Sequence, residues 1–214
     1  MHNLAHTLVS QLDGEMMKKE VGISVERDFK PFPVLWHASA SLREIREEGG
    51  AGSYWVGLGA LVTLAFAIEA FCQTEGPEVL GSDWLEGKVI ERKPVYEKFK
   101  LIGKAVGADV NYGALPWSDV RRVLRARDSL AHPRPAKRQG ATRLTIAPDE
   151  DPTEAVAHLV MEPWEPLLEL KSAQKIADHV DRAIKQIWSR MGRKPWALHM
   201  QGTTSFVMSS TRNE

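Results

Sequence analysis

The sequence offers little from which a disulfide or a cysteine-based metal site could be built, because Cys72 is its only cysteine. One thiol excludes an intramolecular disulfide framework and a cysteine-rich zinc site, and it favours a reducing compartment. The chain also lacks an excess of charge of one sign, since 28 lysines and arginines balance 28 aspartates and glutamates. Any nucleic-acid site must therefore be a local basic patch.

Several targeting and catalytic signals are missing as well. The first residues, MHNLAHTLVSQLDGE, lack a basic segment followed by a long apolar core, so we expect no secretory signal and a cytoplasmic protein. The sequence contains no phosphate-binding glycine loop, HExxH zinc helix or GxSxG turn. Its histidines include no pair at metal-ligand spacing on one helix. We therefore expect neither a metal ion nor a cofactor.

Helical periodicity is the strongest pattern that is present. Apolar residues recur at intervals of three and four in segments 34–48, 54–73, 95–106, 117–132 and 167–191. This spacing is typical of amphipathic helices, and 43% hydrophobic residues in 214 suffice for a packed core. The pattern predicts an all-α fold with four to five main helices.

We divide the chain into three parts. Residues 1–33 form an N-terminal extension, which includes a short extended segment closed by Pro31 and Pro33. Residues 34–192 form the helical domain. Residues 193–214 form a tail with little regular structure. Alternating apolar residues in TRLTIA and AVAHLVM predict a small β-hairpin insertion at about 140–162, before the last long helix.

The most apolar segment, 54–73, has two interpretations. Its uncharged run from Gly49 to Ile68 is close to the roughly 20 residues that span a bilayer. Glu69 within the pattern and the absence of a basic flank favour a buried core helix instead, in which Gly57 and Gly59 allow close helix contacts. Glu69 itself either lies at the solvent-exposed edge of that helix or is a buried carboxylate paired with an arginine of the helix that begins at Trp117.

The segment WSDVRRVLRARDSLAHPRP, residues 117–135, carries the candidate chemistry. Pro133 must end its helix near His132, where the negative end of the helix dipole favours a protonated imidazole. Arg127 and His132 would be about 140° apart on a continuous helix, so they share a face only if the helix ends between them. Asp128 lies four residues before His132 and is placed to orient its ring.

An arginine beside a histidine suits the cleavage of a phosphodiester. The guanidinium binds phosphate oxygens, and the imidazole moves a proton. Further basic residues extend a strip that could hold an RNA backbone: Arg125, Arg134, Lys137 and Arg138. An arginine five residues before a histidine also arises readily by chance, and helix-end histidines beside aspartates are common.

The order of segments adds to this motif. An apolar helix ending AFAIEAFCQ, a shorter helix PVYEKFKLIGKAVG, a helix ending RARDSLAHPRP and a long amphipathic helix follow one another. Over residues 35–191 this succession resembles the HEPN superfamily, whose motif is an arginine, a polar residue and, after a few positions, a histidine. Arg127, Asp128 and His132 match it.

The resemblance implies an up-and-down helical bundle that forms a homodimer in which two such motifs face one cleft. It further implies a metal-independent endoribonuclease acting as a toxin or antiviral defence effector, with His132 as the acid-base group, Arg127 as the phosphate-binding group and Asp128 as the orienting residue. Some members place a tyrosine two residues after the histidine and pair with an antitoxin, whereas Arg134 stands there in this chain. The alternative is a non-catalytic helical module that binds RNA or another protein.

Overall fold

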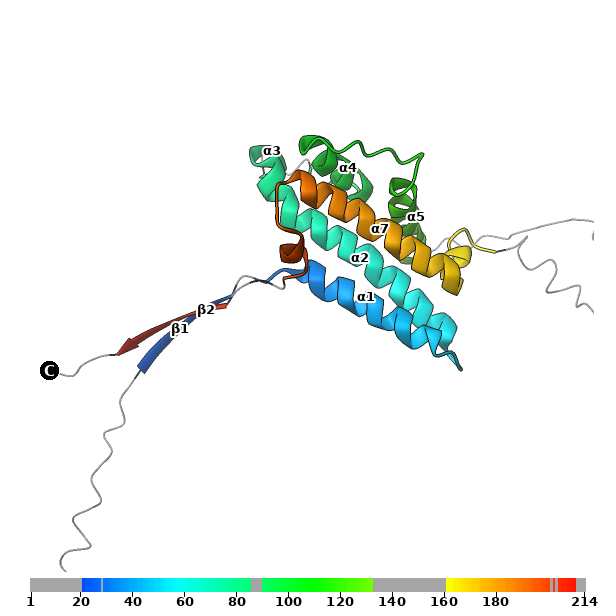
Figure 1. Ribbon diagram of the computed structural model, residues 1–214, viewed down its shortest axis with the longest axis horizontal. Coiled ribbons are helices and arrows are strands. Elements are labelled where there is room, and N and C mark those ends of the chain that lie inside the picture. The colour runs from blue at the N-terminus through cyan, green and yellow to red at the C-terminus, as the bar shows by residue number, and fades with distance from the viewer. Residues whose placement is uncertain are drawn as a thin grey trace, which may run out of the picture. The chain divides into compact units, whose positions relative to one another are not determined.

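The computed structural model describes residues 21–27, 29–85, 90–132, 161–200, 202 and 204–210 (Figure 1). Residues 30–201 belong to a helical unit, and the described residues outside this range belong to a second unit. In that second unit β1 (Val21–Arg27) pairs antiparallel with β2 (Thr204–Ser210). The extended segment expected before Pro31 is therefore a strand, and the tail contains more regular structure than its sequence indicated.

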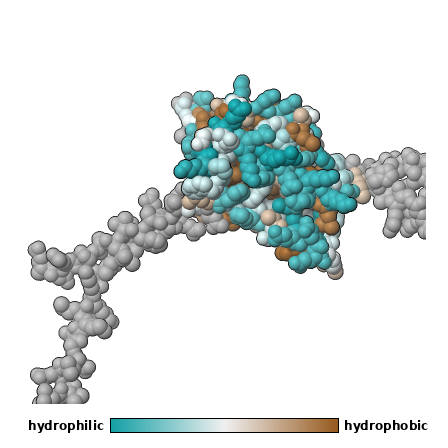
Figure 2. Space-filling view, in the orientation of Figure 1, coloured by the Kyte–Doolittle hydropathy of each residue, from teal (hydrophilic) through white to brown (hydrophobic). Residues whose placement is uncertain are grey.

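The helical unit is an all-α bundle, as predicted. Its elements are α1 (Pro31–Glu47), α2 (Ser53–Leu80), the short α3 (Ser82–Leu85), α4 (Val95–Ala105), α5 (Trp117–Ala131), the 3-10 turn η3 (Glu165–Leu168), α7 (Leu170–Arg190) and the 3-10 turn η4 (Pro195–His199). The predicted hairpin at about 140–162 falls almost wholly outside the described residues. The face of the unit seen in Figure 2 is largely hydrophilic, with small separate hydrophobic patches.

α2 is the central helix of the bundle, because it contacts α1, α4, α5 and η3 (Figure 1). Ile68, Phe71 and Cys72 are fully buried on it. Among the described residues it is the one helix long and apolar enough to cross a membrane, and 56% of its most apolar window is buried inside the unit. The core helix of a soluble protein has the same length and composition, so this property is weak evidence for a membrane span.

Two prolines begin α1 instead of closing the segment before it. Pro31 and Pro33 lie in the first turn, where a helix needs no backbone N–H donor. The helix therefore starts a few residues earlier than the apolar pattern indicated.

The two glycines expected to permit close helix contacts differ in their surroundings. A Cβ on Gly57 would come within 2.7 Å of the Arg46 side chain, so Arg46 packs directly on the backbone of α2. A Cβ on Gly59 would meet Leu42 at 3.7 Å, an ordinary contact. Of these two glycines, only Gly57 allows a side chain of α1 to approach the backbone of α2 more closely than a Cβ would permit.

Candidate functional site

α5 ends where Pro133 predicts. Its last residue is Ala131, and the backbone N–H of His132 donates to the carbonyl of Asp128 at 3.0 Å. The backbone angles of His132, φ −128° and ψ 60°, leave the helix, and its side chain is exposed. An exposed imidazole at a helix C-terminus can reach a ligand from solvent.

Arg127 lies just before the last turn of α5 and contacts α2. Its Nη2 donates to Oε2 of Glu69 in an ion pair, and its Nη1 donates to Oδ1 of Asp128 at 2.8 Å. The guanidinium also lies over the ring of Phe66, with 5.6 Å between the guanidinium carbon and the ring centroid. The side chains of Arg127 and Glu69 are 21% and 30% exposed. The predicted pairing of Glu69 with an arginine of this helix is confirmed, but the carboxylate is partly exposed and not buried as that alternative expected.

The structure brings Arg127 and Asp128 together but leaves the ring of His132 apart from both. Between described residues no hydrogen bond or ion pair joins the imidazole to either side chain. The carboxylate of Asp128 binds Arg127 instead of orienting His132. The arginine side chain is long and flexible enough for its guanidinium to reach the carboxylate of the next residue. Within one chain, the three residues expected to act together therefore form a pair and a separate histidine.

Arg125 is exposed on another side of α5 and lines a pocket of about 150 Å³. The pocket is also lined by Arg122, Ser129 and the aromatic ring of Trp164, which precedes η3. His132 is not among the residues that line this pocket. Arg134, Lys137 and Arg138 lie outside the described residues.

No pattern in the sequence singled out Trp164 as part of this pocket. It lies just after the segment expected to form a hairpin. A half-buried indole beside two guanidinium groups is a surface on which a nucleotide base can stack while its phosphate binds arginine.

A largely buried carboxylate, Asp119, contacts one of these arginines and a histidine of α7. His179 Nδ1 lies 2.5 Å from Oδ2 of Asp119, and Arg122 Nη1 donates to Oδ1 of the same carboxylate at 2.9 Å. The side chains of Asp119 and His179 are 6% and 15% exposed. Asp119 thus contacts both Arg122, which lines the Trp164 pocket, and His179 on α7.

An exposed apolar stripe runs along α2 to the Arg127 pair. Trp55 is 69% exposed and Phe66 is 43% exposed, and Val62 lies between them at helical spacing with Glu69 next in line. The stripe therefore ends at the guanidinium of Arg127. Exposed aromatic residues in a row are typical of protein interfaces.

The described residues contain no group of three or more histidine, cysteine, aspartate or glutamate side chains that could hold a metal ion. Cys72 is fully buried in α2, and burial raises the pKa of its thiol. It is therefore an apolar core residue and not a reactive thiolate.

No family model, curated protein or solved structure matches the chain. Membership of the HEPN superfamily therefore stays a prediction that rests on the order of the helices and on Arg127, Asp128 and His132.

Proposed function

We propose that the protein is a metal-independent endoribonuclease of HEPN type. The observation that carries this proposal is the end of α5, where an anchored arginine, Arg127, is followed by an exposed histidine, His132, just outside the helix. The two groups supply the cation and the proton carrier that phosphodiester cleavage requires.

The reaction uses the 2′-hydroxyl of RNA as the nucleophile. The hydroxyl loses its proton to a base as its oxygen forms a bond to phosphorus, and the bond from phosphorus to the 5′-oxygen breaks as that oxygen gains a proton. The products are a 2′,3′-cyclic phosphate and a 5′-hydroxyl. In this proposal His132 moves the proton, and Arg127 stabilises the charge that develops on the phosphate oxygens.

The contacts of Arg127 are compatible with this role. Glu69 and Asp128 each accept one hydrogen bond from it, and its remaining N–H groups can donate to a phosphate. Because Glu69 belongs to α2, the guanidinium is anchored at the central helix before substrate binds. Such preorganisation lowers the free energy that a bound substrate must supply to position the cation.

The proposal includes a homodimer. Among the described residues of one copy, His132 forms no hydrogen bond or ion pair with Arg127, so in this proposal a second copy supplies the group that completes the site. The exposed stripe from Trp55 to Phe66 ends at Arg127, and a second copy that packs on it would bring its own motif to the same cleft. The partner's motif then completes the site.

RNA would be held along α5. The Trp164 ring offers a face for one base, and Arg125 and Arg122 offer charge for its phosphate. A cytoplasmic toxin or antiviral effector of this kind would be controlled by an antitoxin or defence partner protein. No membrane contact is part of this proposal.

A second candidate function is a non-catalytic helical module that binds RNA or protein. The observation that favours it is that Arg127 already pairs with Glu69 and Asp128. An arginine with a purely structural role forms the same kind of ion pairs. In that case the stripe on α2 and the Trp164 pocket would be binding surfaces without chemistry.

Cleavage of RNA in the presence of EDTA separates the two functions. The purified full chain should cut RNA and leave 2′,3′-cyclic phosphate ends, and an RNA whose 2′-hydroxyl is replaced by hydrogen at the cut position should resist it. Binding of RNA without any cut product would support the non-catalytic module.

A further inference from the structure

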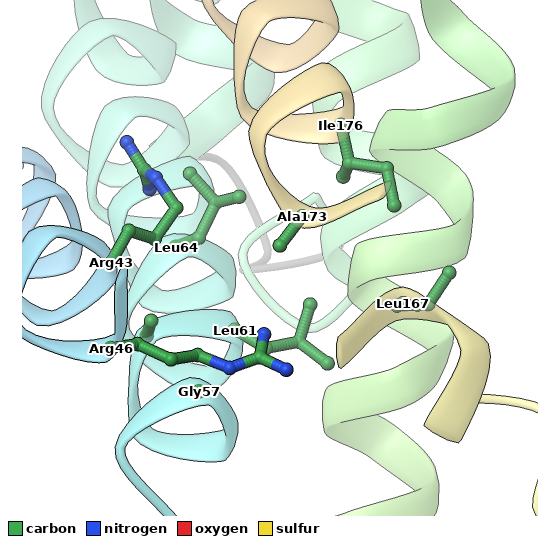
Figure 3. A pocket seen from close by; sticks show the side chains of 9 residues that line it. Arg43, Arg46, Gly57, Leu61, Leu64, Leu167, Ala173 and Ile176 are labelled. Carbon is green, nitrogen blue, oxygen red and sulfur yellow. The ribbon is translucent and has the colours of Figure 1, made fainter. Parts of the chain in front are cut away.

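A second cluster of arginines lies away from α5, around a small cavity between α1, α2, η3 and α7. Figure 3 shows the Arg46 guanidinium pointing across Gly57 toward Leu61, whereas the Arg43 side chain, also from α1, points past Leu64 in another direction. The cavity has a volume of about 20 Å³. This exceeds the roughly 10 to 15 Å³ that one water needs and is far too small for a nucleotide.

Both arginines carry buried N–H groups without an acceptor. Nε of Arg43 and Nη1 of Arg46 have no hydrogen-bond partner among the described residues, although both atoms are shielded from solvent. A buried donor that is left unpaired costs about 1 to 3 kcal/mol, and more when it is charged. An acceptor in the cavity would remove this cost.

The positions of the two guanidinium groups are fixed by their neighbours. Arg43 Nη1 donates to Oγ of Ser39 at 2.8 Å, and that hydroxyl donates to the carbonyl of Ala60 at 2.9 Å. Arg46 lies flat on Gly57, where any Cβ would displace it. Neither side chain can therefore turn into solvent without losing these contacts.

Nearby carboxylates do not neutralise the cluster by direct contact. Asp178, Glu44 and Glu47 act on Arg43 through space, yet burial outweighs them and lowers the pKa of its guanidinium. Among described residues neither Arg43 nor Arg46 forms an ion pair within 4.0 Å. The Arg46 guanidinium thus borders a water-sized space, and no carboxylate of the described residues pairs with it there.

The other residues that line the cavity are apolar, and they determine which kind of anion can bind. Leu61, Leu64, Leu167 and Ile176 line it, and they offer no hydrogen bond. A phosphate or sulfate would bring several oxygens and a second charge that these side chains cannot satisfy. A halide is a single sphere that accepts from a few N–H groups and tolerates apolar contacts.

We propose that this cavity binds one chloride-sized monovalent anion through the unpartnered N–H group of Arg46, while Arg43 adds a second positive charge to the lining. The bound anion would link α1 and α2 to η3 and the first turn of α7, because Leu167 and Ala173 close the cavity from that side. The site is independent of the proposed RNA chemistry.

The test compares thermal unfolding of the full chain in sodium chloride and in sodium gluconate at equal ionic strength, since gluconate is too large for the cavity. The wild type should unfold at a higher temperature in chloride, with a saturable dependence on its concentration. Arg46→Met and Gly57→Ala should each weaken the apparent chloride affinity at least tenfold. The matched control Arg190→Met, an exposed arginine on α7, should behave as the wild type does.

Because the two salts are compared within each variant, a variant of lower stability still reports on the anion. Crystals soaked in sodium bromide provide a second measurement, and anomalous scattering should place a bromide beside Nη1 of Arg46. A water without anomalous signal there, or an equal chloride effect in the wild type and Arg46→Met, would overturn the proposal.

Discussion

The guanidinium of Arg127 on α5 donates to the carboxylate of Glu69 on α2, which stands 58 positions earlier in the chain. The pair joins the proposed catalytic helix to the central helix of the bundle. Since both side chains are partly exposed, its contribution to stability is limited by solvent screening.

A double-mutant cycle measures this contribution. Glu69→Gln and Arg127→Gln should each lower the free energy of unfolding, and the double variant should lose less than the sum of the two. We expect a coupling energy of about 0.5 to 1 kcal/mol from urea denaturation, larger at low salt than at high salt. Additive effects at low salt would show that the pair does not stabilise the fold.

A glycine pair in α2 tests the packing of the bundle. A Cβ on Gly76 would come within 2.2 to 2.6 Å of the Trp84 ring, whereas a Cβ on Gly59 would make only ordinary contact with Leu42. Gly76→Ala should therefore destabilise the protein by about 1 to 3 kcal/mol. Gly59→Ala should be neutral or stabilise it by up to about 1 kcal/mol, because alanine favours the helix. Equal effects of the two changes on chemical denaturation would contradict this packing.

The stability of the helical unit should fall below neutral pH because of His199. Its ring stacks on Phe32 at 6.3 Å, and burial, followed by the charge of His37, lowers its pKa. Asp181 opposes this shift and Lys185 adds to it. Since the folded state then binds the proton less readily than the unfolded state, this contribution is complete above about pH 6.5 and is lost as the pH falls through the lowered pKa.

His199→Phe should keep the stacking and flatten this pH dependence. We expect the free energy of unfolding of the variant to change less than that of the wild type between about pH 7 and pH 5. If the free energy of unfolding depended on pH in the same way in both proteins, another group would be the cause of the loss of stability.

Trp164 should contribute to RNA binding. Stacking of a base on an aromatic side chain is worth about 1 to 3 kcal/mol, so Trp164→Ala should weaken the affinity for a short RNA by roughly 5-fold to 100-fold. The measurement uses the His132→Ala protein so that the RNA stays intact. Trp196→Ala removes a 63% exposed tryptophan from η4 and serves as the matched control. Equal losses in both variants would exclude a specific role for Trp164.

Helical periodicity was sufficient to predict the bundle and the end of α5, because buried stripes and a proline stop act locally. The proline-rich start of α1 was missed, since Pro31 and Pro33 suit a first turn as well as a break. The partner of Glu69 was predicted as one of two alternatives, because a carboxylate on an apolar helix must either reach solvent or pair with a cation.

The other features of the site depend on contacts between distant residues. Asp128 was expected beside His132 from its spacing of four, but the nearer guanidinium of Arg127 takes its carboxylate. Trp164 lines the same pocket as Arg125 because η3 packs against α2 and α7, which no local pattern encodes. The Arg43 and Arg46 cavity likewise requires side chains from four elements.

The most direct test of the proposed function is the rate of RNA cleavage in EDTA by three proteins: wild type, His132→Ala and His37→Ala. His37 is an exposed histidine on α1 and controls for the loss of a surface imidazole. We expect the wild type and His37→Ala to cleave RNA. The cleavage rate of His132→Ala should be lower by at least about 100-fold, with an unchanged circular dichroism spectrum. Cleavage by His132→Ala at the wild-type rate, or no cleavage by the wild type, would contradict the proposed function.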